Sequence, residues 1–207
     1  MPQKSEGERR SWMKPASVVV TILGAALLVA SFFLPYASST GDYRAWLEAN
    51  PDGMYAEELG MTNADAADLS LLEYARTYAQ AEVFGLDSLF IVYTFIIAAV
   101  LVFSLVGLVL AALRKPIGTM VFSVLSFATV LLLNWDFQER GVVSGSLYDW
   151  GIAKWVYVAA FVVTLAGAVW LLVVKVQENR ARRNRQGAQV WGCFRRMRIR
   201  KRKEWSC

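Results

Sequence analysis

The sequence predicts an all-α integral membrane protein with four transmembrane helices and a small helical cap between the first and second of them. Hydrophobic residues make up 56% of the 207 residues and the mean hydropathy is +0.37, whereas soluble domains are usually about 45 to 50% apolar. Four uncharged runs are each long enough to cross a bilayer. The loops after the first and third runs are acidic, whereas the link after the second run and the tail after the fourth are basic. This alternation indicates which loops lie on the same side of a membrane.

The two central runs form a hairpin. Residues 89–113 and 117–134 carry no charged side chain, and at about 1.5 Å per helical residue each can cross roughly 30 Å of hydrocarbon. The link between them is the basic tripeptide 114–116, which is too short for anything except an antiparallel return. These segments are the predicted second and third spans.

The first span is predicted at residues 16–38, after a polar tail of residues 1–15. Its uncharged core exceeds the roughly 7 to 15 residues of a signal-peptide core, which favours a retained helix. The small residues after Tyr36 would also suit a cleavage site, so that alternative stays open. Pro35 is expected to end the helix, because the residue before a proline leaves the α region, and Tyr36 to supply an interfacial aromatic ring.

Residues 39–88 form the acidic cap. They hold ten acidic and two basic residues, a net charge of −8, together with too many leucine and tyrosine side chains for a disordered tract. We expect one short helix at residues 42–49 and another after Ser70, where Ser70 and Glu73 fit a capping box. The cap is expected to fold against the second outer loop rather than to extend into water.

The last third of the chain completes the topology. A second outer loop is predicted at residues 135–154, with turn signals at Gly141 and around Gly145, and a fourth span at residues 155–174. Residues 175–207 form a tail with twelve basic and two acidic residues, a net charge of +10. The positive-inside rule then places both termini in the cytoplasm and the cap outside.

Several chemistries are excluded by composition. The chain has no His and only two Cys, Cys193 and Cys207, so neither a His-based nucleophile pair nor a Cys-x-x-Cys redox site can form within it. No acidic or basic residue lies inside the predicted spans, which argues against a proton or ion pump. We therefore expect no enzyme activity, no cofactor and no metal site.

The acidic pairs do not identify a cation site. The run Asn63-x-Asp65-x-x-Asp68 lacks the central glycine and the closing glutamate of an EF-hand loop, so a solvated face is the preferred interpretation. Asp136, at the rim of the third span, is interpreted as a polar cap of its helix, with a binding role as the alternative.

The basic tail is predicted to contact anionic lipid on the inner leaflet rather than nucleic acid. Lys and Arg clusters beside a membrane gain roughly 1 kcal/mol per residue near the surface. The expected contacts are Arg180, Arg182, Arg183, Arg185, Arg195 and Arg196.

The small residues of the spans recur at four-residue spacing, as at Ser17, Thr21 and Ala25, which lets helices approach closely. We expect these ridges to pack within the chain, although a partner's helix would also fit them. Four spans with a large first outer loop resemble the layout of claudin-like proteins. The Gly-Leu-Trp motif and the Cys pair of that family are absent from the first loop, so neither its fold nor its junction role is carried over.

These features predict a non-catalytic interaction or accessory subunit, with a protein partner or a second copy of the chain bound at the cap. The alternative is a component of an oligomeric transporter or channel. Missing disulfides and missing Asn-x-Ser/Thr sequons favour a bacterial inner membrane as the location. The residues expected on the partner surface are Trp46, Tyr55, Tyr74, Tyr78, Asp136 and Trp150.

Overall fold

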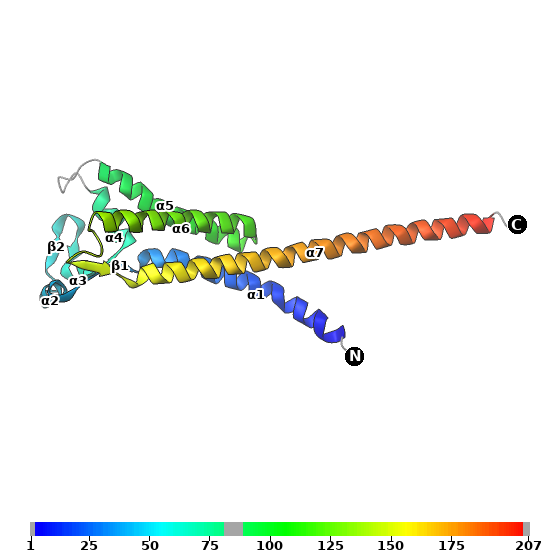
Figure 1. Ribbon diagram of the computed structural model, residues 1–207, viewed down its shortest axis with the longest axis horizontal. Coiled ribbons are helices and arrows are strands. Elements are labelled where there is room, and N and C mark those ends of the chain that lie inside the picture. Colours follow the sequence, from blue (N-terminus) through cyan, green and yellow to red (C-terminus); the bar gives the residue numbers. More distant parts are fainter. Residues whose placement is uncertain (1–2, 81–88, 205–207) are drawn as a thin grey trace.

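The computed structural model describes residues 3–80 and 89–204, as four long helices with a small mixed domain at one end (Figure 1). Each of the four helices is long and apolar enough to cross a membrane, so the prediction of a helical membrane protein is confirmed at this level. The membrane-length segments are Pro15–Phe33, Val92–Ala112, Pro116–Glu139 and Ile152–Ala181.

Helix α1 (Gln3–Ala30) ends earlier than the predicted boundary at residue 38. A 3-10 turn, Ser31–Phe33, follows it, and Leu34 is already extended because Pro35 excludes the α conformation from the residue before it. Pro35 therefore opens a strand, which carries Tyr36 into the cap domain.

Helices α5 (Leu89–Ala112) and α6 (Pro116–Glu139) form the predicted antiparallel hairpin. The amide of Arg114 donates to the Ala111 carbonyl and the amide of Lys115 donates to the Leu110 carbonyl, both at 2.9 Å, which is a Schellman motif. Pro116 then starts α6 at a position where its missing N–H costs nothing.

Helix α7 (Ile152–Glu204) begins at the cap and continues without a break through the basic tail (Figure 1). The start of α1 and the end of α7 lie on the side of the long helices away from the cap. Trp135 on α6 and Trp155 on α7 are 65% and 68% exposed near the cap end of their helices, where aromatic rings favour the headgroup zone of a bilayer.

The expectation of a purely helical cap is wrong, because the domain contains short strands. A three-stranded antiparallel sheet has the order β4-β1-β5, with its edge strand β5 supplied by the second loop. Strands this short leave no room for a period-two pattern to show in the sequence. The elements are β1 (Pro35–Ser39), α2 (Gly41–Ala49), β2 (Met54–Ala56), η2 (Glu57–Leu59), β3 (Met61–Thr62), α3 (Asn63–Ala67), β4 (Asp68–Ser70), α4 (Leu71–Ala79) and β5 (Tyr148–Trp150).

Local signals in the cap placed both of its longer helices correctly. Helix α2 occupies the predicted residues 42–49 plus one more, and α4 starts directly after Ser70. The Ser70 amide donates to Glu73 Oε2 at 2.5 Å, and the Glu73 amide donates to Ser70 Oγ at 3.3 Å, so the capping box is present. Residues 81–88, the end of the predicted acidic segment, lie outside the described residues.

Small residues join α1 to α7. A Cβ placed on Gly24 would lie 2.6 Å from Thr164 Oγ1, and a Cβ placed on Gly167 would lie 2.7 Å from Thr21 Oγ1. Each helix therefore packs a threonine side chain against a glycine of the other helix. The small-residue ridges of α1 and α7 are buried, as expected for packing within the chain. Their buried members are Ser17, Thr21, Ala25, Ala160, Thr164 and Ala168.

Candidate functional site

Three aromatic side chains of the cap gather in what we call the aromatic patch: Tyr43, Trp46 and Tyr55. Trp46 is 61% exposed and Tyr55 43%, and Tyr43 is half-buried. The rings of Tyr43 and Trp46 stack at 6.1 Å with an interplanar angle of 9°, and the Tyr43 hydroxyl donates to the Tyr55 hydroxyl at 3.3 Å. Helix α2 and strand β2 therefore present a preformed aromatic surface.

Acidic residues border the aromatic patch. Glu48 and Glu57 lie within two residues of Trp46 or Tyr55 in the chain, and both are exposed. Over residues 35–80 the cap has eight acidic and two basic residues, a net charge of −6. One of the two bases, Arg44, is engaged with Glu48 at 2.8 Å and Asp68 at 3.3 Å. A surface of this kind complements a basic partner.

The other four residues predicted on the partner surface lie together beneath the cap, in what we call the junction. Tyr74 and Tyr78 are buried, so they do not belong to an exposed partner surface, and both rings pack on Phe137, with centroids at 5.1 Å and 6.3 Å. Asp136 and Trp150 are half-buried in the same region. The expectation that α4 packs on the tops of the spans and on the second loop is thereby confirmed.

Tyr36 is the central side chain of the junction, a role that its sequence position did not suggest. It is 2% exposed, and its hydroxyl donates to Asn134 Oδ1 of α6. Its ring makes edge contacts with Tyr74 of α4, Phe137 of α6 and Trp150 of β5, at 6.4, 5.9 and 5.7 Å. One ring thus joins the sheet, the cap helix and the long helices.

Arg140 closes the rim of the junction at the end of α6. Its Nε lies 2.9 Å from Asp136 Oδ2, and its guanidinium lies 4.2 Å from the Tyr93 ring centroid. The Tyr93 hydroxyl donates to Asp136 Oδ1 at 3.3 Å. Asp136 is therefore held at the rim of α6 by side-chain partners from two elements.

Burial changes the acidity of the junction tyrosines. Removal from water raises the pKa of both Tyr36 and Tyr74 above the ordinary value near 10, because the phenolate form loses hydration. The pKa of Tyr148 is raised in the same direction, chiefly by burial. Its hydroxyl donates to the Ala66 carbonyl at 2.8 Å. These groups stay neutral at physiological pH, so they serve packing.

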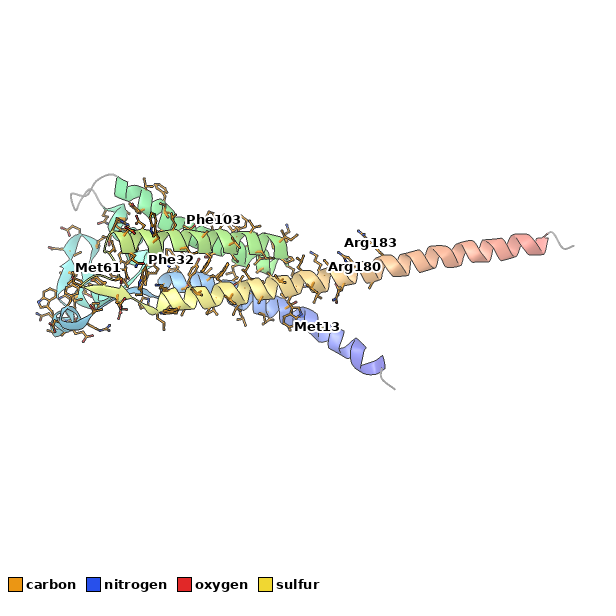
Figure 2. All side chains as sticks on the ribbon, viewed as in Figure 1. Met13, Phe32, Met61, Phe103, Arg180 and Arg183 are labelled. Atoms are coloured by element: carbon orange, nitrogen blue, oxygen red, sulfur yellow. The ribbon has the colours of Figure 1, made fainter. Side chains whose placement is uncertain are left out.

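Among the expected lipid contacts, Arg180 and Arg183 are exposed on α7 beyond the packed helices (Figure 2). The side chains of Arg182, Arg185, Arg195 and Arg196 lie outside the described residues. At about 1.5 Å per residue, the Arg195 backbone lies roughly 20 Å further along α7 than that of Arg182. Arg180 is the last residue but one of the membrane-length part of α7, which ends at Ala181, and Arg183 lies two residues beyond that end.

Hydroxyl groups link three of the long helices inside the hydrocarbon-length region. Ser104 Oγ of α5 lies 2.8 Å from Ser126 Oγ of α6, and Ser126 also donates to the Val100 carbonyl at 3.1 Å. The Tyr157 hydroxyl of α7 bonds Ser126 and lies 3.4 Å from Ser104. Hydroxyl groups that bond one another across helices in this way hold the helices of a membrane bundle together.

Asp65 and Asp68 of the cap have local partners. The Asp65 carboxylate accepts from the amide of Thr62 at 3.0 Å and completes a second capping box, and Asp68 faces Arg44. Within the described residues, no three His, Cys, Asp or Glu side chains gather as they would around a metal ion.

No protein-family model matches this chain, and neither the curated proteins nor the solved structures provide a similar one. Function is therefore argued from the surfaces alone.

Proposed function

We propose that the protein is a non-catalytic accessory or assembly subunit that uses its cap to hold a second membrane protein. The aromatic patch is the observation that carries this proposal. Exposed aromatic side chains that gather on one face are typical of binding surfaces, and Tyr and Trp dominate the energy of such contacts. The acidic border favours a partner segment that carries Lys or Arg.

The proposed topology places the cap on the outer face and both ends of the chain in the cytoplasm of a bacterial cell. Support comes from the charge difference between the cap and the tail and from the common side on which the two ends lie. Reporter fusions after Lys115 and Lys203 should give a cytoplasmic signal, and fusions at Gly53 and Gly145 an outside signal. The opposite pattern of signals would contradict the proposed topology.

The partner is best tested by photo-crosslinking in intact membranes. A photoreactive amino acid at Trp46 or at Tyr55 should crosslink to a second, different chain, because these side chains would lie in the contact. The matched control is Arg76, which is exposed on α4 of the same cap but outside the aromatic patch. Equal crosslinking at Arg76 and Trp46, or none at Trp46, would contradict the proposed surface.

A homo-oligomer would point to the rival function. Crosslinks at Trp46 between copies of this chain, together with ion or solute flux in liposomes, would replace the accessory subunit by a transporter or channel component. A stable complex with a different chain and no flux would support the accessory subunit.

The tail is proposed to hold anionic lipid through diffuse attraction by Arg180, Arg183 and the basic residues that follow. Binding to anionic vesicles should fall steeply as salt rises, because exposed charges are screened over about 8 Å at 0.15 M ionic strength. Equal binding to neutral vesicles would contradict this account.

A further inference from the structure

A cavity of about 370 Å³ opens between α1, the end of α5 and α7, on the side of the long helices away from the cap. Its size falls in the range of small-molecule sites, about 300 to 1,000 Å³. The lining residues are Pro15, Val18, Leu113, Arg114, Leu171, Val174, Lys175 and Glu178.

The lining is amphipathic and lies where the apolar segments of α1 and α5 end. Pro15 is the first residue of the membrane-length part of α1, and Ala112 is the last of that part of α5, two residues before Arg114. The inner wall is formed by Leu171 and Val174, which are buried, and the mouth carries the exposed Arg114 and Lys175. An occupant must therefore have an apolar part toward the hydrocarbon and an anionic part toward the interface.

The backbone at Arg114 supports a role for its side chain. Its φ is +55°, in the left-handed region that glycine normally occupies at this position of a Schellman motif. An arginine here accepts backbone strain that glycine would avoid, and such outliers cluster at functional positions. The left-handed turn places Arg114 in the lining of the cavity.

We propose that this cavity binds one anionic phospholipid, with the phosphate between Arg114 and Lys175 and the acyl chains passing Val18 and Leu113 into the bilayer. Basic pockets between transmembrane helices are known to hold anionic head groups. Glu178 adds one carboxylate to the lining, beside the two basic residues Arg114 and Lys175 that would face the phosphate. The site is distinct from the diffuse contact of the tail and does not depend on the cap having a partner.

The test uses the full chain taken up in nanodiscs that contain equal amounts of phosphatidylglycerol, phosphatidylethanolamine and phosphatidylcholine. After gentle release into detergent, native mass spectrometry should find one phosphatidylglycerol retained per chain in preference to the two zwitterionic lipids. Equal retention of the three, or preference for the ethanolamine lipid beside Glu178, would overturn the proposal.

Two variants and a control locate the site. Arg114→Gly combined with Lys175→Gln should reduce phosphatidylglycerol retention at least tenfold, and glycine suits the left-handed turn, so the fold is expected to hold. Val18→Phe should also reduce retention, because it fills the cavity without changing charge. The control is Lys115→Gln, which removes a charge from the same link but not from the lining, and it should retain the lipid.

Soluble glycerol phosphate distinguishes the lipid from its head group. It should not displace the bound phosphatidylglycerol, because it lacks the acyl chains that contact Val18 and Leu113. Displacement at low concentration would show that the cavity is a site for a free phosphate compound and would overturn the lipid assignment. Equal loss in Lys115→Gln and in the double variant would show general attraction by charge and would also overturn it.

Discussion

The α1–α7 seam and the junction beneath the cap are both buried, but they are built from opposite kinds of side chain. At the seam, Gly24 and Gly167 bring two backbones together over Thr164 and Thr21. At the junction, large rings with polar tips surround Tyr36.

The difference follows from the solvent that each region excludes. Lipid tails are as apolar as leucine, so helices inside a bilayer gain little by burying apolar area and associate through close packing of small residues. Outside the hydrocarbon the alternative to burial is water, and each large ring then contributes through the area it removes from water. The seam should therefore be sensitive to added volume and the junction to lost volume.

The largest effect is expected for Tyr36→Ala. Loss of the ring would leave a cavity among α4, α6 and β5 and an unpaired Asn134, so the free energy of unfolding of the cap should fall by about 3 to 5 kcal/mol. Hydrogen exchange of cap amides in detergent micelles measures this. The control is Tyr55→Ala in the exposed aromatic patch, which should change stability by less than about 0.5 kcal/mol. Similar losses for both variants would refute a central role for Tyr36.

The seam is tested in the opposite direction by Gly24→Ala. The added Cβ would meet Thr164 Oγ1 at 2.6 Å and the Thr164 backbone amide at 2.7 Å, so α1 and α7 must move apart at a cost of about 1 to 3 kcal/mol. Unfolding by increasing sodium dodecyl sulfate from mixed micelles reports it. Gly107→Ala is the matched control, since its Cβ would have 3.7 Å to its nearest neighbour, and its stability should be unchanged or slightly higher.

The two regions also differ in how far the sequence predicted them. The seam follows from a repeat of small residues within each helix, and the capping boxes and Pro116 are signals within four residues, so all of these could be predicted. The pairing of β1 with β5 joins Ala37 to Trp150, more than a hundred residues apart, and no local pattern encodes it. For the same reason Tyr36 was predicted as an interfacial ring and not as a buried one, because its neighbours come from three elements that are distant in the chain.

Within the candidate site, composition identified the aromatic residues of the cap but not their exposure. Tyr74 and Tyr78 share one face of α4 with Leu71, at spacings of three and four residues, and this periodicity indicates an inward face. Trp46 and Tyr55 lie on different elements, so only the folded cap shows that they belong to one surface with Tyr43.

A change of pH should separate the junction from the seam. Burial raises the pKa of Tyr36 and Tyr74 in the folded cap. Their contribution to the stability of the cap is therefore present in full below pH about 10 and is lost as pH rises above it, because the unfolded chain ionises first. Each such tyrosine lowers stability by about 1.4 kcal/mol per pH unit in that range. Cap amide exchange between pH about 9 and about 11, the range around the ordinary tyrosine pKa near 10 at which the unfolded chain ionises, should accelerate more in the unmutated protein than in Tyr74→Phe.

The smallest effect is expected for Ser70→Ala, which removes the hydroxyl of the α4 capping box but no ring from the junction. Its loss leaves the Glu73 amide without its Ser70 Oγ acceptor, at a cost of about 1 kcal/mol. The cost should stay local, because Tyr74 and Tyr78 still hold α4 against Phe137.

Hydrogen exchange should therefore speed up in the first turn of α4 and stay unchanged in α2, while Ser70→Thr, which keeps a capping hydroxyl, should behave like the unmutated protein. Faster exchange across α2 and α4 together would mean that the cap unfolds as one unit, so that its packing and its capping cannot be separated. Unchanged exchange in α4 would mean that the packing of Tyr74 and Tyr78 alone positions the helix and that the capping box contributes little to its stability.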